Sequence, residues 1–384
     1  MGSSKLVYIR TDGNSHIATG HLMRTLSIAR ACAQKELSVS FIVSDLESKE
    51  LLQRFLIQEA LFPALFPIIV LEELTQLTPD SPCISYSEPE QELSVFCTLL
   101  QEAKPSLLLI DSYFITPEYV NTLSSYTRLA YLDDLRKYDY AIDLIVNYDV
   151  IPDTQLGSYQ ASYKNAQQCL LGATYTPLRS QFQNLSYSLS SDVHNILITT
   201  GGSDEYNVAL HVLQEFIIEL SGSDTSSSTL KKQYEAHALH FHIVVGSLNT
   251  HKNQLEAFCK KYDFVHLHEH VADMAALMCS CDLSISAAGT MLYELCAVGL
   301  PAISYCIADN QIPAATAFHQ VGAIPCTGDV RTDSSIYHEL VHAALDLGDS
   351  YEKRCSHSAA MRKLVDGKGS ERIACAIDKI ITTA

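Results

Sequence analysis

Short apolar runs of strand length alternate with longer helical patterns along this chain, and this alternation restricts the fold more than any other feature. In the first half the runs are LVYIR at 6–10, VSFIVS at 39–44, SLLLID at 106–111, RLAYLDD at 128–134 and DLIVNYD at 143–149. The same alternation begins again with NILITTGGSD at 195–204 and continues through FHIVVG, FVHLHE, LSISAAG and AISYC. Such alternation indicates βαβ units on parallel sheets, one sheet in each half.

The length of the chain agrees with two domains. A chain of 384 residues exceeds what one hydrophobic core usually supports, and 47% hydrophobic residues supply material for two cores. The polar stretch SQFQNLSYSLSSDVH lacks periodicity and is typical of a linker. We therefore predict a first domain at 1–182, a linker at 183–193 and a second domain at 194–384, with an exposed loop in the polar run that begins at Ser221.

Net charge and hydropathy limit the kinds of partner that the protein can bind. The formal net charge of −18 argues against general nucleic-acid binding, which needs clustered Lys and Arg. The start MGSSKLVYIR does not have the apolar region of a signal peptide, and no stretch approaches the roughly 18 to 20 apolar residues of a membrane span. We expect a cytoplasmic protein without a membrane partner, as a monomer or weak dimer.

The twelve cysteines are scattered and lack the paired CxxC spacing of zinc sites. They are interpreted as buried thiols in a reducing compartment. Cys279 and Cys281 come closest to a motif, but a one-residue gap favours packing. We expect neither a metal nor a cofactor.

A strand end, a small-residue loop and a helix start follow one another between Arg10 and Arg24. In parallel α/β sheets, ligands bind beyond the carboxyl ends of strands, where such loops lead into helices. His21 falls in the first turn of the expected helix, where the positive end of the helix dipole favours a neutral imidazole that can accept a proton from water. The alternative is a histidine that only caps or packs, with Arg10 and Arg24 in surface ion pairs.

Three turns in the second half have the same strand, turn and helix order. In Thr200-Gly201-Gly202-Ser203-Asp204, glycines allow backbone N–H groups to approach an anion, although a plain tight turn fits too. Ala288-Gly289-Thr290 offers donors to a diphosphate, and Glu294 one turn later suits ribose hydroxyls. Asn310-Gln311 suits hydroxyl and acetamido groups, with ordinary helix capping as the alternative.

Acidic residues also end strands in the first half, at Asp111-Ser112-Tyr113 and at Asp133-Asp134. Adjacent carboxylates at a strand end point in opposite directions and do not form the spaced arrangement of metal-dependent sugar-nucleotide transferases. Capping or hydrogen bonding to a substrate is therefore the preferred interpretation of Asp133 and Asp134.

Together these segments resemble the UDP-sugar hydrolases of pseudaminic acid biosynthesis, which remove UDP from UDP-2,4-diacetamido-2,4,6-trideoxy-β-L-altropyranose. The resemblance covers nearly the whole chain, and the order and spacing of modest motifs carry it. They are Arg10-x-Asp12, Gly20-His21-x-x-Arg24, Asp111-x-Tyr113, Leu132-Asp133-Asp134, Tyr175-x-Pro177-Leu178-Arg179, Gly201-Gly202-Ser203-Asp204, Ser286 to Thr290 with Tyr293-Glu294-Leu295, and Asn310-Gln311.

The resemblance implies an α/β protein of glycosyltransferase-B (GT-B) architecture, in which two Rossmann-like domains with parallel sheets face a central cleft. It implies that His21 is the catalytic base for attack of water at the anomeric carbon with inversion, while helix N-termini of the second domain stabilise the leaving UDP. The implied substrate-binding residues are Arg10, Asp12, Gly20, Arg24, Tyr113, Asp134 and Arg179 in the first domain, and Gly202, Ser203, Ala288, Gly289, Thr290, Glu294, Asn310 and Gln311 in the second.

Two further expectations follow. Because the chain is acidic, we expect a locally positive site built from helix N-termini with Arg10, Arg24 and Arg179. Because Ala18-Thr19-Gly20-His21 stands where the family usually has Gly-x-Gly-His, we expect the sugar-facing loop to differ.

Two other functions stay open on the sequence. An inverting GT-B glycosyltransferase would use the same nucleotide site and activate an acceptor hydroxyl, and a sugar-nucleotide-binding protein would bind without turnover. A Rossmann dehydrogenase is disfavoured because neither Gly loop supplies G-x-G-x-x-G with its acidic residue.

Overall fold

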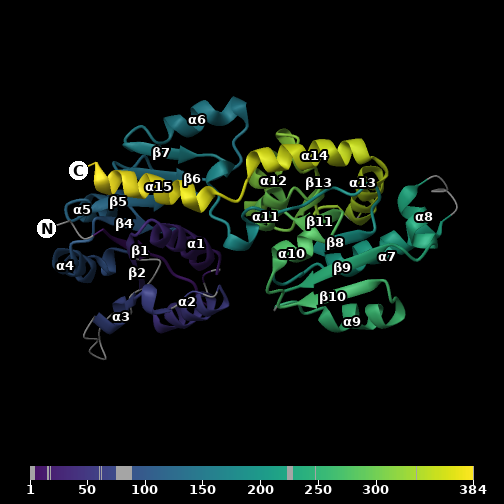
Figure 1. The fold of residues 1–384 in the computed structure, drawn as a ribbon, viewed down its shortest axis with the longest axis horizontal. Helices are drawn as coiled ribbons and strands as arrows, with labels where there is room; N and C mark the ends of the chain where they lie inside the picture. Colours follow the sequence, from purple (N-terminus) through teal and green to yellow (C-terminus); the bar gives the residue numbers. More distant parts are fainter. Residues whose placement is uncertain are drawn as a thin grey trace. The chain divides into compact units, whose positions relative to one another are not determined.

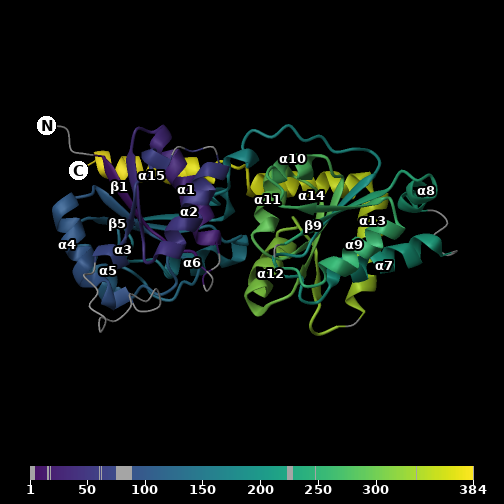
Figure 2. The same ribbon diagram turned by 90° about the horizontal axis from the view of Figure 1, so that it is seen from below.

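The chain forms two compact α/β units in the computed structural model (Figure 1), which describes residues 5–14, 17, 19–59, 61, 63–74, 89–222, 228–246, 248–333 and 335–383. Unit 1 comprises residues 1–180 and 367–384, and unit 2 comprises residues 181–366. Figure 2 shows the same elements from below. Ala18 and most of the polar run after Ser221 lie outside the described residues.

Unit 1 contains a seven-stranded parallel sheet in the order β3-β2-β1-β4-β5-β6-β7. Its strands are β1 (Leu6–Arg10), β2 (Ser38–Val43), β3 (Ile68–Val70), β4 (Leu107–Ile110), β5 (Arg128–Leu132), β6 (Leu144–Asn147) and β7 (Gln168–Leu171). Its helices are α1 (Gly20–Gln34), α2 (Leu46–Gln58), α3 (Leu71–Leu74), α4 (Leu93–Ala103), α5 (Pro117–Leu123), α6 (Leu156–Ala161) and α15 (Gly369–Thr382).

Helices cover both faces of this sheet, which explains why its central strands are continuous apolar runs. Alternate residues of β4 belong to different cores: Leu107 and Leu109 pack with residues of α1, α2 and α15, whereas Leu108 and Ile110 pack with residues of α4 and α5. The period of two in a strand sends successive side chains to opposite faces.

Unit 2 contains a six-stranded parallel sheet in the order β10-β9-β8-β11-β12-β13. Its strands are β8 (Asn195–Thr199), β9 (His240–Val245), β10 (Val265–Glu269), β11 (Leu283–Ala287), β12 (Ala302–Cys306) and β13 (Cys326–Asp329). Its helices are α7 (Val208–Ser221), α8 (Thr229–Glu235), α9 (Lys252–Lys261), α10 (Met274–Cys279), α11 (Met291–Val298), α12 (Ile312–Gln320), α13 (Ile336–Asp349) and α14 (Tyr351–Leu364). None of the described helices is long and apolar enough to cross a membrane.

The last helix, α15, belongs to unit 1, and this corrects the assignment of residues 194–384 to one domain. Ile373, Ile377 and Ile381 of α15 lie in the core that also holds residues of β1 and α1. Gly369 begins the helix where a Cβ atom would lie 2.1 Å from the carbonyl oxygen of Thr176, so only glycine fits this approach. Sequence periodicity predicted the helix but carried no signal for the sheet it covers.

The histidines of β9 and β10 form a ladder at the edge of the second sheet. His242 Nδ1 lies 3.0 Å from His268 Nε2, and His242 Nε2 lies 3.0 Å from Asn195 Oδ1. The amide oxygen can only accept, so His242 donates from Nε2 and accepts at Nδ1 as a neutral imidazole. Burial, together with the neighbouring histidines, lowers the pKa of His242 to about 4.

We predict that Ile377→Ala destabilises unit 1, because Ile377 is fully buried and truncation leaves a cavity. The expected loss of unfolding free energy is about 2–5 kcal/mol in urea titrations. Hydrogen exchange should accelerate in β1 and α1 and stay unchanged in β8 and β11. Lys379→Ala, at an exposed position of the same helix, is the control, and equal acceleration in both units would contradict the packing.

We also predict that unit 2 loses stability as pH falls from about 6.5 toward about 4. The pKa of His242 is lower in the folded state than its ordinary value of 6.5, so the unfolded chain binds more protons in this window. The drop in thermal unfolding midpoint between pH 7 and pH 5 should be smaller in His242→Gln. His237→Asn, at an exposed site, should keep the full drop, and an unchanged drop in His242→Gln would refute the assignment.

Candidate functional site

Both sheets reverse their strand order at one place, and several of the predicted site residues follow the strands at these two places. In unit 1 the reversal lies between β1 and β4, and in unit 2 it lies between β8 and β11. In open α/β sheets, ligands bind beyond the carboxyl ends of the strands at such a reversal, where the loops leaving neighbouring strands diverge. His21 and Asp111 follow β1 and β4, while Gly202 and Gly289 follow β8 and β11.

His21 is held by a buried carboxylate at the reversal of the first sheet. It occupies the second position of α1, is 4% exposed, and its Nδ1 lies 2.7 Å from Asp111 Oδ1. Because the ionised carboxylate can only accept, Nδ1 carries the proton and Nε2 presents its lone pair. The arrangement therefore makes Nε2 a proton acceptor with a fixed orientation.

Arg24, one turn further along α1, keeps Asp111 ionised. Its Nε donates to Asp111 Oδ2 at 2.7 Å, and its Nη2 donates to Asp111 Oδ1. Its Nη1 donates to Asp134 Oδ2 at 2.7 Å and to the Tyr148 hydroxyl. Burial by itself would raise the pKa of Asp111, but Arg24 and His21 lower it to about 2. Arg24 thus positions the carboxylate that positions the imidazole.

Arg10 and Asp12 form a second buried network. Arg10 donates from Nε and Nη2 to the two Glu92 oxygens at 3.1 and 2.8 Å, from Nη1 to Asp12 at 2.5 Å and from Nη2 to Ser44 at 2.7 Å. Asp12 also accepts from the Ser44 backbone N–H at 2.6 Å. Glu92 further accepts from the Tyr119 hydroxyl at 2.6 Å. These contacts hold the loop that leads from β1 toward His21.

The expectation that Arg10 and Arg24 add positive charge to the ligand site is therefore wrong. Both guanidinium groups are paired with carboxylates, Arg10 with Asp12 and Glu92 and Arg24 with Asp111 and Asp134. A buried charge needs such partners because leaving water is costly. Arg179 lies half-buried after β7, near the end of unit 1.

Tyr113 and Asp134 supply accessible polar groups beside His21. The ring of Tyr113 meets the imidazole edge-on with centroids 4.6 Å apart, and the residue is 43% exposed. Partial burial of Tyr113 and the nearby Asp134 raise the pKa of Tyr113 to about 12, so the phenol is neutral at physiological pH. Asp134 is 23% exposed in its side chain. A Cβ atom added to Gly20 would meet open space, so the start of α1 is uncovered.

The side chains of Asp133 and Asp134 have different partners, as expected for adjacent residues that point in opposite directions at a strand end. Asp133 Oδ1 accepts from the backbone N–H groups of Leu135 and Arg136 at 2.8 and 2.9 Å and caps the turn after β5. Asp134 instead pairs with Arg24. The two carboxylates therefore serve different purposes.

In unit 2 the loop after β8 presents exposed backbone. Gly201 has φ of 81°, which favours glycine, and Gly201 to Ser203 are exposed. Asp204 is buried and accepts from the Val208 N–H at 2.7 Å, so it caps α7. The loop thus leads exposed residues into a capped helix, an arrangement that suits anion binding.

In the turn after β11, the N–H groups of Ala288 and Gly289 have partners within the protein and do not face a diphosphate as expected. Ala288 donates its N–H to the Tyr305 carbonyl at 2.8 Å, and Gly289 donates its N–H to the Ala287 carbonyl at 2.8 Å. Both donors are therefore engaged in holding the turn. The N–H groups of Leu292 and Tyr293 at the start of α11 donate to the Gly289 and Thr290 carbonyls at 3.1 Å each. Thr290 is exposed immediately before α11, so its hydroxyl is the group here that suits an anion.

The residues predicted after β12 separate into two roles. Gln311 Oε1 accepts from the Ile307 N–H at 2.9 Å and holds the strand end, whereas Asn310 is exposed. Glu294 is half-buried in the first turn of α11. Of the two amides, Asn310 is thus the more accessible to a ligand.

Sequence reasoning missed several residues that build these networks. Glu92 and Tyr148 carry no motif, and only their three-dimensional contacts reveal them. The Thr199 hydroxyl donates to Ser286 Oγ at 2.8 Å and joins β8 to β11 at the reversal of the second sheet. Polar residues inside otherwise apolar strands were the available signal for this pair.

We predict that Asp111→Asn lowers the unfolding free energy by about 3–5 kcal/mol, because it leaves the buried Arg24 charge with one carboxylate. Asp134→Asn, which removes the more exposed partner of the same guanidinium, should cost about 1 kcal/mol or less. Urea denaturation at pH 7 measures both. Equal losses would show that burial of Asp111 does not set its contribution.

Comparison with known proteins supports the architecture of both units. Residues 196–364 match the Glycosyltransferase family 28 C-terminal domain. The spore coat polysaccharide biosynthesis protein SpsG of Bacillus subtilis is 28% identical over 206 residues, which cover 53% of this chain and 56% of that protein. The UDP-2,4-diacetamido-2,4,6-trideoxy-beta-L-altropyranose hydrolase of Campylobacter jejuni is 24% identical over 243 residues, 62% of this chain and 76% of that protein. The chain thus spans little more than half the length of SpsG.

Solved structures resemble nearly the whole chain. MurG of Acinetobacter baumannii matches with a TM-score of 0.61 and 13% identity over 97% of this chain and 99% of its own. UDP-GlcNAc 2-epimerase of Neisseria meningitidis matches with a TM-score of 0.64 and 12% identity over 97% of this chain and 99% of its own. The chain therefore has the GT-B fold, built from two parallel-sheet α/β domains, the second of which matches a glycosyltransferase C-terminal domain.

Proposed function

We propose that this protein is a UDP-sugar hydrolase that cleaves UDP from a UDP-2,4-diacetamido-2,4,6-trideoxyhexose in nonulosonic (pseudaminic) acid biosynthesis. The observation that carries the proposal is the His21–Asp111 pair at the strand reversal of unit 1, which leaves Nε2 as an oriented proton acceptor. The likeness to the Campylobacter jejuni hydrolase supports the substrate class.

In the proposed reaction, His21 Nε2 accepts a proton from water while the water oxygen attacks the anomeric carbon. The bond between that carbon and the diphosphate oxygen breaks, and UDP leaves with the bonding electrons. Attack opposite the leaving group inverts the configuration and yields the free sugar. Asp111 accepts from Nδ1 and stabilises the imidazolium that forms, which is the function of a carboxylate behind a catalytic histidine.

Unit 2 is proposed to hold the UDP. The exposed loop from Gly201 to Ser203 would offer backbone N–H donors to the diphosphate, and exposed Thr290 before α11 would offer its hydroxyl. Glu294 would accept from the ribose hydroxyls. In unit 1, Tyr113 and Asp134 are the accessible groups beside His21, and Asn310 in unit 2 would bind a sugar substituent.

An inverting glycosyltransferase is the second candidate, and the match to the family 28 C-terminal domain favours it. That enzyme would use the same base and nucleotide site, with an acceptor hydroxyl in place of water. The two functions differ in one observable, because a transferase releases UDP rapidly only when its acceptor is present.

We predict that the protein releases UDP from UDP-2,4-diacetamido-2,4,6-trideoxy-β-L-altropyranose without an acceptor and in EDTA. His21→Gln should lower kcat by about 10²–10⁴-fold, the usual contribution of a general base. UDP affinity, measured by calorimetry, should stay unchanged, because the nucleotide is proposed to bind unit 2. His237→Asn is the control for an exposed histidine.

Reaction in H₂¹⁸O identifies the bond that breaks. Attack at the anomeric carbon places ¹⁸O in the sugar, whereas attack at phosphorus places it in UDP. Label in UDP would overturn the proposed role of His21. Tight UDP binding with no release would overturn hydrolysis, and release that begins only on addition of an acceptor would establish the transferase.

A further inference from the structure

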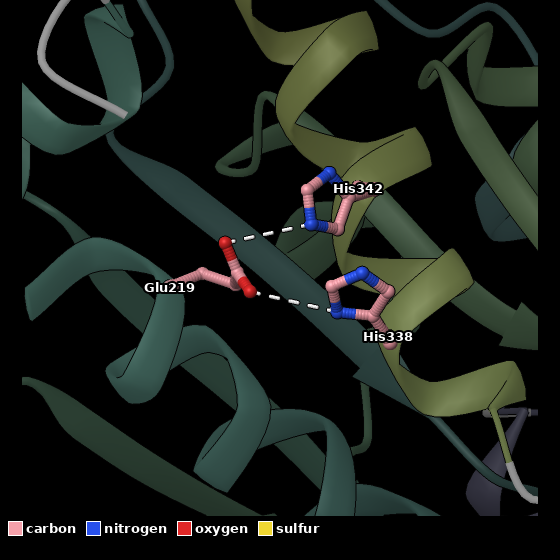
Figure 3. Close-up of side chains that lie close together, drawn as sticks. All are labelled: Glu219, His338 and His342. Atoms are coloured by element: carbon pink, nitrogen blue, oxygen red, sulfur yellow. Dashed lines mark ion pairs between the residues drawn. The ribbon is translucent and has the colours of Figure 1, made fainter. Parts of the chain in front are cut away.

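Two helices of unit 2 bring Glu219, His338 and His342 close together (Figure 3). His338 and His342 are four residues apart on α13, so they share one face of that helix. Glu215 and Glu219 have the same spacing on α7, which packs against α13. Two pairs of potential metal ligands therefore face each other.

The atoms of three of these side chains converge on one point. Glu219 Oε1 lies 3.5 Å from His338 Nδ1, and Glu219 Oε2 lies 3.4 Å from His342 Nε2, as Figure 3 shows. One ligand atom from each of the three residues lies within 4.8 Å of the others. Ligand atoms of one tetrahedral zinc ion, at bond lengths near 2.1 Å, lie about 3.4 Å apart. The observed spacing needs only small side-chain shifts to admit an ion.

The sequence around these residues has a recognised metal-binding spacing. Residues 338–342 read His-Glu-Leu-Val-His, in which two histidines at i and i+4 on a helix can bind zinc together. Two imidazoles and a carboxylate suit Zn²⁺, Ni²⁺ and Cu²⁺ better than Mg²⁺ or Ca²⁺, which prefer oxygen ligands. Glu215, whose Oε1 lies 2.9 Å from His338 Nδ1, adds a second carboxylate at the same place.

We propose that His338, His342 and Glu219 form a site for a divalent transition-metal ion of the zinc type that links α13 to α7. The ion would lie between the Glu219 carboxylate and the nitrogens His338 Nδ1 and His342 Nε2. The two imidazole side chains are 54% and 48% exposed, so the ion can enter from solvent and a water molecule can complete its coordination.

This site is separate from the proposed chemistry and does not depend on the proposed function. Glu219 is eleven residues beyond Val208, so it lies about 16 Å along α7 from the helix end that follows the Gly201–Ser203 loop. An ion there would hold together two helices of unit 2, α7 and α13, at a distance from the Gly201–Ser203 loop. Zinc binding and UDP release can therefore be measured independently.

The test is calorimetric titration of the whole, metal-stripped protein with ZnCl₂, repeated with NiCl₂. Wild type should bind one ion at this site, and His342→Gln and Glu219→Gln should each bind that ion at least about 10-fold more weakly. Glu339→Gln, on the same helix turn, and His237→Asn are the matched controls and should bind as wild type. All variants keep every cysteine, so the difference from wild type excludes thiol-bound zinc.

Thermal unfolding of the metal-free proteins accompanies the titration. Zinc should raise the unfolding midpoint of wild type and Glu339→Gln and raise that of His342→Gln less, because only binding to the folded state stabilises it. Equal zinc affinity in wild type and His342→Gln would overturn the proposal. A lower metal-free midpoint in both ligand variants, with no response to zinc in any protein, would also overturn it and leave these residues as ion pairs.

Discussion

The buried carboxylate of Asp111 is the group on which the candidate site of unit 1 depends. It stands at the end of β4, has no exposed surface, and binds His21 and Arg24 of the first two turns of α1. Arg24 keeps it ionised, so the imidazole has one tautomer and one orientation before any ligand arrives. Groups fixed in advance need little reorganisation during a reaction, which is how polar sites accelerate chemistry.

The pairing of Arg10 and Arg24 with carboxylates also bears on how a chain of net charge −18 could bind the proposed anionic ligand. Arg10 and Arg24 stabilise buried carboxylates, so their charges are already neutralised within unit 1. The residues exposed at the second strand reversal are Gly201 to Ser203 before α7 and Thr290 before α11, where the proposed diphosphate would bind. Helix N-termini attract phosphate without any side-chain cation, and a net charge of −18 is therefore compatible with nucleotide binding.

Local periodicity predicted the two parallel sheets, and strand-end motifs placed His21 in the first turn of α1. Periodicity could not show which distant residues meet. Asp111 follows His21 by 90 residues, and Glu92 follows Arg10 by 82, so their contacts depend on sheet order rather than on any local pattern. The packing of α15 on unit 1 was unpredictable for the same reason. The His-Glu-Leu-Val-His pattern was visible, but Glu219 became its neighbour only through the packing of α7 on α13.

Carboxylates contact imidazoles in both units, at Asp111 and at Glu219, and the surroundings of the two carboxylates differ. At Asp111 an arginine supplies a permanent positive charge within a buried network, so the histidine keeps a free nitrogen for proton transfer. At Glu219 each carboxylate oxygen lies near an exposed imidazole, Oε1 at 3.5 Å from His338 Nδ1 and Oε2 at 3.4 Å from His342 Nε2. The proposed divalent ion would satisfy all three groups at once. A histidine whose buried carboxylate partner also binds a guanidinium is therefore suited to act as a base. Two exposed histidines that share one carboxylate are suited to bind a metal ion.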